Sequence, residues 1–328
     1  MHVTPYVWAI TIAVTVVFLV VDVFVIGRRP HEPSAGESAR HLAFFLGCAV
    51  LFGLGVLAIS GPGFAGEFYA GWLTEYSLSV DNLFVFIVIM SKLSVPKQYQ
   101  QTALLVGIVL ALLMRGAFIA VGAAAINQFS WVFYLFGGFL IYTAVKLARQ
   151  GTSGAEDYRE NALMRWTRKH LPASEDYHGV RLTVLQGGKR LITPMAVVIV
   201  ALGTTDLLFA LDSIPAIYGL TKEPYLVFAA NVFALMGLRQ LYFLIGTLLT
   251  RLVYLGAGLS VLLGFIGVKL MLHALHGNQL PFLNSGRQVE WAPDIPTWIS
   301  LVAIVLILGT TTVASLVKSG RVGGTEPA

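Results

Sequence analysis

Charge is scarce in this chain of 328 residues: Asp, Glu, Lys and Arg together make up only 12% of it. A soluble domain carries roughly twice that share. Hydrophobic residues make up 56%, and the mean hydropathy is +0.76. These values exclude a soluble enzyme, a disordered chain and a fibrous repeat. They predict an all-α protein, a polytopic bundle of transmembrane helices.

Cysteine is nearly absent as well. Cys48 is the single cysteine, so the chain cannot form an internal disulfide. The sequence also lacks a nucleophile paired with a base, a phosphate-binding loop and a histidine-containing metal motif, so we expect neither an enzyme nor a resident cofactor. The net charge of +5 does not indicate nucleic-acid binding, because basic residues of membrane proteins gather in cytoplasmic loops.

Long apolar runs are what the sequence has in abundance. A helix needs about 20 mainly apolar residues to cross a membrane. Nine stretches meet this requirement: 6–26, 41–59, 68–91, 102–124, 129–148, 193–217, 225–249, 253–275 and 297–317. We expect the first to be a retained helix rather than a cleaved signal peptide. No basic residue precedes it, and no small-x-small cleavage site follows it.

The distribution of basic residues predicts the orientation. Sixteen Lys and Arg fall on one side of the nine spans, eight of them between residues 149 and 190, and two fall on the other side. We therefore expect a multi-pass protein of a bacterial plasma membrane, with the N-terminus outside and the C-terminus in the cytoplasm. Residues 158–171 mix apolar and basic side chains, which predicts a short helix on the inner membrane surface. A partner-docking role for this segment is the alternative.

Two parts of the sequence repeat each other. EYSLSVDN in the third span matches DLLFALDS in the sixth, since each has an acid, five residues, then Asp and a small polar residue. Arg115 matches Arg239, and Lys146 matches Lys269, and the three matches have offsets of 131, 124 and 123 residues. Spans three to five and six to eight are thus two copies of one unit. An odd number of crossings inverts the second copy, as in secondary transporters, whose sites lie near the midplane.

The repeat divides the chain into five parts. They are the N-terminal helices (1–64), the first repeat (65–149), a cytoplasmic loop (150–190), the second repeat (191–276), and an outer loop with the ninth span and a short tail (277–328).

Ionisable side chains lie deep within these apolar spans. Each costs about 2.5–3.5 kcal/mol at a helix centre, so six would cost on the order of 15–20 kcal/mol if they faced lipid. We therefore expect them to face the bundle interior and to pair there. The six are Glu75, Asp81, Asp206, Asp212, Arg115 and Arg239. Static acid–arginine bridges are the structural alternative to an ion site, although apolar packing would stabilise the bundle more cheaply.

Helical geometry limits which of these groups can meet. Residues seven apart share a face, as Glu75 and Asn82 do, and as Asp206 and Ser213 do. Asp81 and Asp212 each lie about 100° round from that face. For both acids of a span to reach one ion, the helix must be wide-mouthed, kinked or locally unwound. Pro215, just after Asp212 and Ser213, favours such a break.

The expected ligands are all oxygens: carboxylates, the Asn82 amide and the hydroxyls of Ser213, Thr74, Thr204 and Thr205. Hard oxygen ligands suit Mg, Ca and Mn. Four carboxylates and two arginines leave a charge of −2, which one divalent cation would neutralise. Four further residues are candidates for the ion pathway: Asp22, Asn231, Lys146 and Lys269. Asp22 can instead reach the membrane interface, Asn231 can bond a neighbouring helix, and the lysines can snorkel to the interface.

Several segments resemble the TerC family, over about residues 4–318. They are EYSLSVDNLFVF, VPKQYQ, LLMRGAFI, TDLLFALDSIPA, NVFALMGLRQLYFL and VKL. The resemblance implies an integral membrane metal-ion transporter of the LysE-type superfamily, similar to manganese exporters. The family name reflects an association with tellurium resistance. Carried over by position, the resemblance implies these metal ligands: Glu75, Asp81, Asn82, Asp206, Asp212 and Ser213.

Two functions of different classes fit the sequence. The first is export of Mn(II), with Ca(II) or Mg(II) as other possible substrates, by alternating access and in exchange for protons. The second is a membrane scaffold, or a biogenesis or stress-resistance factor, that transports nothing. The second function gives no reason for paired deep acids in both repeats. We expect metal ions, protons and the lipid bilayer as partners, and the sequence leaves the oligomeric state open.

Overall fold

The structure is a computed structural model of the chain. It describes residues 3–28, 33–129, 131–150, 174, 176–186, 189–245, 254–278, 289, 291–293 and 295–322. The side chains of Asp22 and Asp81, two predicted site residues, lie outside the described part, as does the predicted surface helix at 158–171.

Nine long helices make up most of the described residues. They are α1 (Pro5–Arg28), α2 (Ala35–Ser60), α3 (Pro62–Lys92), α4 (Lys97–Gln128), α5 (Val132–Gln150), α7 (Pro194–Tyr218), α8 (Pro224–Ile245), α9 (Leu255–His276) and α10 (Thr297–Val322). Eight are long and apolar enough to cross a membrane, and α1 adds a slightly shorter apolar stretch, Pro5–Val21. The predicted fold class, an all-α polytopic bundle, is confirmed.

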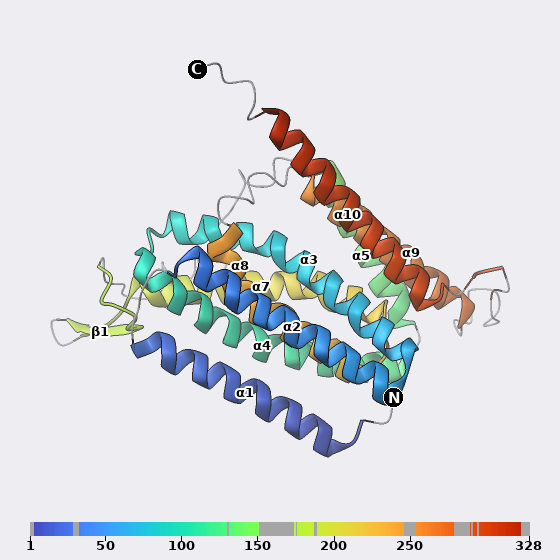
Figure 1. Cartoon of the computed structure of the whole chain (residues 1–328), viewed down its shortest axis with the longest axis horizontal. Helices are drawn as coiled ribbons and strands as arrows, with labels where there is room; N and C mark the ends of the chain where they lie inside the picture. Colours follow the sequence, from blue (N-terminus) through green and yellow to red (C-terminus); the bar gives the residue numbers. More distant parts are fainter. Residues whose placement is uncertain are drawn as a thin grey trace.

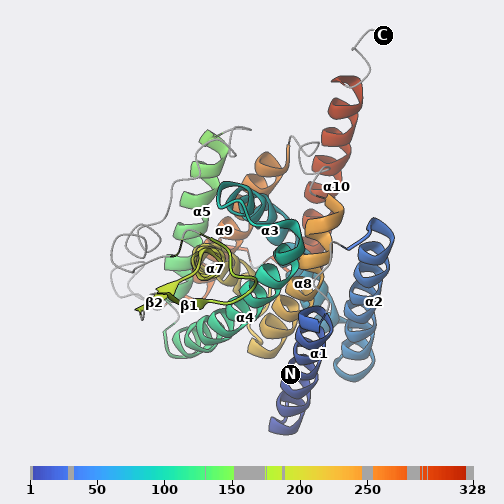
Figure 2. The ribbon, with the colours of Figure 1, turned by 90° about the vertical axis from the view of Figure 1, so that its left-hand side faces the viewer.

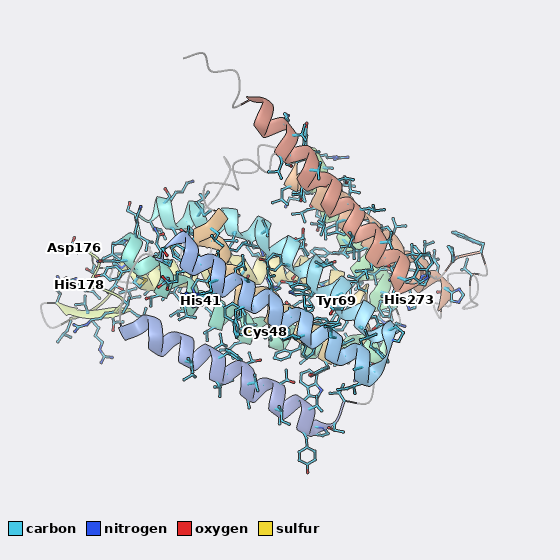
Figure 3. All side chains as sticks on the ribbon, viewed as in Figure 1. His41, Cys48, Tyr69, Asp176, His178 and His273 are labelled. Carbon is cyan, nitrogen blue, oxygen red and sulfur yellow. The ribbon has the colours of Figure 1, made fainter. Side chains whose placement is uncertain are left out.

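A short β-hairpin, which the sequence pattern did not predict, lies between α5 and α7 along the chain. Strands β1 (Thr183–Gln186) and β2 (Lys189–Ile192) pair antiparallel. Nearby, the Tyr177 hydroxyl donates to the carbonyl of Leu93 at 2.7 Å and so ties this segment to the turn between α3 and α4. Burial raises the pKa of Tyr177, which therefore remains a donor at neutral pH. We call this end of the molecule the hairpin end; Figure 3 shows Asp176 and His178 there and His273 at the opposite end.

Four helices form the centre of the bundle. Viewed from the hairpin end, α3, α4, α7 and α8 lie in the middle, with α1 and α2 on one side and α5 on the other (Figure 2). The most extensive contacts join α3 to α8, α4 to α7 and α5 to α9. This set maps onto itself when α3 is exchanged for α7, α4 for α8 and α5 for α9. Two inverted copies of a three-helix unit produce such a contact pattern.

The helices α5 and α9 cross closely at glycines, beside the tilted α10 (Figure 1). A Cβ added to Gly267 would lie 3.0 Å from the Gly137 carbonyl oxygen and 3.0 Å from the backbone nitrogen of Ile141. Inside a bilayer the hydrophobic effect does not drive helices together, because lipid tails are themselves apolar. Membrane helices therefore associate through close packing of this kind.

The helix α7 runs unbroken through Pro215 to Tyr218, and α3 is likewise continuous. The prediction of a locally unwound helix at this position is therefore wrong. Pro215 lies in the last turn, where the Gly219 amide donates to the Pro215 carbonyl at 3.0 Å and closes the helix. A proline this near the end removes a hydrogen bond but has little helix beyond it to redirect.

Candidate ion-binding site

The centre of the site is the guanidinium of Arg115, midway along α4. Its side chain is 1% exposed. It forms an ion pair with Glu75 of α3 and a second, two-bond pair with Asp206 of α7. The bonds to Asp206 run from Nε to Oδ2 at 2.9 Å and from Nη2 to Oδ1 at 3.1 Å. Arg115 thus joins Glu75 of α3 to Asp206 of α7, the two acids that match each other in the sequence repeat.

One guanidinium nitrogen donates to oxygens from three helices. Nη1 of Arg115 donates to Glu75 of α3, to the Ser213 hydroxyl of α7 at 3.3 Å and to the Asn231 amide oxygen of α8 at 2.9 Å. This nitrogen carries two hydrogens, so three acceptors compete for them. We call Glu75, Asp206, Ser213 and Asn231 the oxygen cluster.

Some polar atoms beside the cluster have no hydrogen-bond partner among the described residues. They are Oε2 of Glu75 and the hydroxyl of the preceding residue, Thr74. Both residues are fully buried. The other oxygen of Glu75 also accepts a bond from Ser79 at 3.4 Å. A buried polar atom without a partner is costly, so these two oxygens indicate unused capacity to bind a cation or a donor.

Asn231 both joins the cluster and bonds a neighbouring helix, because its amide oxygen accepts from Arg115 of α4. Its amide nitrogen donates to the Val227 carbonyl of its own helix at 2.9 Å, which turns the amide oxygen towards Arg115. The predictions of Asn82 and Thr205 as site residues are not tested by a contact, but both residues are buried.

Asp212 lies apart from the oxygen cluster. It is half-buried and accepts a bond from Thr143 of α5 at 3.2 Å. The positive charge of Lys146, one turn further along α5, also acts on it. Asp206 and Ser213, seven residues apart, both reach Arg115, whereas Asp212 faces α5. The 100° offset expected from the sequence therefore separates the acids of α7 into two places.

The two repeat-related arginines have different surroundings. Arg239 is buried in α8, where it lines a small cavity with Phe18 and Leu19 of α1. With the Gln240 amide oriented to satisfy its hydrogen bonds, its oxygen accepts from Nη2 of Arg239 at 2.8 Å. Pairing of Arg239 with one of the acids stays a prediction.

The two repeat-related lysines also differ. Lys146 is exposed, in agreement with snorkelling to the membrane interface. Lys269 is buried, and its ammonium donates to the Ser300 hydroxyl of α10 at 2.9 Å, so snorkelling is wrong for this residue.

Lys269 lines a cavity of about 340 Å³ at the end opposite the hairpin. Glu67 at the start of α3 lines it too and accepts a bond from the Thr221 hydroxyl at 2.6 Å. Glu223, Lys222 and His273 complete its ionisable lining. Neither Glu67 nor Glu223 is among the site residues predicted from the sequence. An acid two turns before Glu75 was the available signal for Glu67.

Along α7, residues 214–217 are apolar and buried, and they lie between Ser213 of the oxygen cluster and Tyr218 at the cavity. Ile217 packs against Gly71 of α3, where an added Cβ would lie 3.2 Å from its methyl group. Tyr218 lines the cavity, and its hydroxyl donates to the Ile119 carbonyl of α4 at 2.6 Å, which fixes the ring. The hairpin end is filled by a larger apolar cluster, which includes Phe86, Met90, Val95, Met195, Val198 and Leu202.

Apolar helices of membrane-spanning length packed around a buried cluster of charges are the structure of an integral, multi-pass membrane protein. Comparison with protein families identifies its family. The family model described as "Integral membrane protein TerC family" matches residues 60–322, and the chain belongs to this family.

Relatives of known sequence agree. The membrane protein MT2795 of Mycobacterium tuberculosis (strain CDC 1551 / Oshkosh) is 47% identical over 312 residues, which cover 94% of this chain and 78% of the relative. STKORF319 of Myxococcus xanthus is 37% identical over 316 residues, 96% of this chain and 93% of the relative. Alx of Escherichia coli (strain K12), whose name proposes a role as a membrane-bound redox modulator, is 34% identical over 281 residues, 82% of this chain and 86% of the relative. No solved structure matches the chain.

Proposed function

We propose that this protein is a secondary transporter that exports a divalent metal cation, Mn(II) foremost, from the cytoplasm. One observation carries the proposal: oxygens from both repeats converge on a single buried point at Arg115. Substrate sites of inverted-repeat transporters lie at the interface of the repeats near the midplane. A buried ionisable cluster within a membrane is a functional feature by default, because its insertion is costly.

The chemistry of the oxygen cluster supports a divalent cation. Carboxylate, hydroxyl and amide oxygens are hard ligands, which Mg, Ca and Mn prefer. The cluster offers two carboxylates from different repeats, so a single divalent ion would balance their charge. The resemblance to manganese exporters favours Mn(II) within this group.

The two ends of the bundle support alternating access. The end with His273 holds the 340 Å³ cavity, and the hairpin end is closed by apolar packing. The basic loops are expected on the cytoplasmic side, and they include the hairpin. In that orientation, the cavity faces the outside. Rocking of one repeat against the other would close the cavity and open the hairpin end.

Exchange for protons is part of the proposal. Metal ligands bind a metal only when deprotonated, so a carboxylate can carry a proton on the return step. Asp212 suits this role, since it is half-buried and bonded to the Thr143 hydroxyl rather than to the guanidinium of Arg115.

The role in the name of Alx does not transfer to this chain as an internal dithiol switch. The chain has one cysteine, Cys48, and a dithiol needs two. The scaffold function, likewise, gives no reason for an oxygen cluster assembled from both repeats.

Metal content of cells tests the proposal. Cells that express the wild type should hold less manganese under a manganese load than cells with Asp206→Asn, measured by elemental analysis at equal membrane expression. Asp176→Asn is the matched control, because it makes the same change at an exposed residue of the loop beside the hairpin (Figure 3). Equal manganese content with the wild type and Asp206→Asn would contradict the proposal.

A further inference from the structure

We propose that Arg115 is a tethered counter-ion which occupies the cation site whenever the site holds no metal. The guanidinium and the metal then exclude each other, and Arg115 determines how strongly and how selectively the site binds. The inference rests on the proposed function and adds the identity of the group that the metal displaces.

The geometry at Nη1 is that of a cation site. Oxygens of Glu75, Ser213 and Asn231 approach this one nitrogen from three different helices. A planar guanidinium nitrogen has two hydrogens in fixed directions, so it satisfies two acceptors. A spherical divalent cation accepts six or more oxygens without such directions. The set of ligands therefore fits a metal ion better than it fits the nitrogen.

The incomplete hydrogen bonding argues against a purely structural ion pair. A buried structural network stabilises a protein only when every member is satisfied. Here Oε2 of Glu75 and the Thr74 hydroxyl lack a partner within the described residues. Glu75 therefore has an oxygen in reserve, which an incoming ion can bind once the guanidinium has moved away.

Charge explains why the two cations exclude each other. Glu75 and Asp206 carry −2 together, and Arg115 reduces this to −1. A divalent cation placed among the same oxygens would lie in direct contact with the guanidinium. Two positive charges at such a short distance repel each other strongly in a buried site. The guanidinium must swing away for the metal to load, and it returns when the metal leaves.

Two consequences follow for transport. The empty site always has a positive charge available, so Glu75 and Asp206 need no protons for the return step. A monovalent ion carries no more charge than the guanidinium, so it gains nothing over the bonds that the guanidinium makes to Asp206. A divalent ion carries more charge and does gain. Arg115 is thus the residue that selects divalent over monovalent cations.

Binding of Mn(II) to the purified full-length chain tests the inference. Removing a competitor tightens binding, so Arg115→Gln should bind Mn(II) at least ten-fold more tightly than the wild type and should lose selectivity against Na⁺. Arg115→Lys keeps a cation and should remain close to the wild type. Arg149→Gln, which removes an exposed arginine of α5, controls for loss of one positive charge and should leave the affinity unchanged.

A second measurement covers poor folding of the variant. Mn(II) should raise the thermal midpoint of Arg115→Gln more than that of the wild type, including the case in which the variant folds only with the metal present. Equal or weaker binding of Mn(II) by Arg115→Gln than by the wild type, or no stabilisation of the variant by the metal, overturns the inference. If the wild type still binds Mn(II) when that result is obtained, the proposed function stands and only the inference is overturned. If neither the wild type nor Arg115→Gln binds Mn(II), the inference and the proposed function are both overturned.

Discussion

Replacing Asp206 by asparagine should destabilise the protein far more than the same change at Asp212. The carboxylate of Asp206 accepts two bonds from Arg115, at 2.9 Å and 3.1 Å, in a fully buried place. Asp212 is half-buried and accepts one bond, from Thr143 at 3.2 Å. The two acids lie six residues apart in one helix, so the pair of variants is well matched.

The magnitudes follow from these contacts. A hydrogen bond to a charged group contributes about 1.5–3 kcal/mol, and breaking a buried ion pair costs about 3–5 kcal/mol. Asparagine at position 206 can accept one bond but turns its own N–H groups towards the guanidinium. We expect Asp206→Asn to lose about 3–5 kcal/mol and Asp212→Asn to lose about 1 kcal/mol or less.

The assay is unfolding of the detergent-solubilised protein, followed by intrinsic fluorescence and repeated in an Arg115→Gln background. In that background Asp206 is an uncompensated buried charge, so Asp206→Asn should no longer cost stability and should recover part of the loss. Equal costs for the two asparagine variants, or an unchanged cost of Asp206→Asn without Arg115, would refute the assignment of the ion pair.

Three further outcomes are expected. Gly267→Ala should lower the unfolding free energy by about 1–3 kcal/mol, because its Cβ would meet backbone atoms of α5 at 3.0 Å. Gly264→Ala should be tolerated, because its Cβ would lie 3.7 Å from the nearest neighbour. Equal unfolding midpoints for the two variants would contradict the packing argument. Gly122→Ala places a Cβ 2.9 Å from the ring of Tyr218, so it should displace the ring. A thiol reagent should then label more quickly a cysteine introduced on the side of the ring that faces the oxygen cluster, and unchanged labelling would contradict this. Asp212→Asn should stop metal flux while the protein stays folded and inserted; normal flux would remove Asp212 from the pathway.

Hydropathy predicted the helices because the bilayer leaves little freedom. A span needs about 20 apolar residues, and eight of the nine predicted spans coincide with helices that meet this requirement. The ends could not be predicted as well. The span predicted at 102–124 belongs to α4, which runs from Lys97 to Gln128, since a helix continues into the polar interface beyond the apolar run. The hairpin is short, and its strands, TVLQ and KRLI, lack the alternation that identifies a half-buried strand.

The direction of each site side chain around its helix axis was predictable from the sequence, but the residues that it contacts on neighbouring helices were not. The seven-residue spacing placed Asp206 and Ser213 on one face, and the structure brings both to Arg115. The assumption that Asp212 must reach the same ion led to the expectation of an unwound helix, whereas the continuous helix directs Asp212 to Thr143 of α5. Helix periodicity gives the direction of a side chain within its own helix. It does not say which neighbouring helix lies in that direction.

Flux of radioactive Mn(II) into proteoliposomes, measured with and without a pH gradient, shows directly whether the protein transports Mn(II). Wild-type protein should carry Mn(II) faster than protein-free liposomes, and an opposing proton gradient should accelerate the flux. Asp206→Asn should reduce the flux to the protein-free level, and the exposed-site control Asp176→Asn should leave it unchanged. Wild-type flux no greater than that of protein-free liposomes, or undiminished flux with Asp206→Asn, would contradict the account.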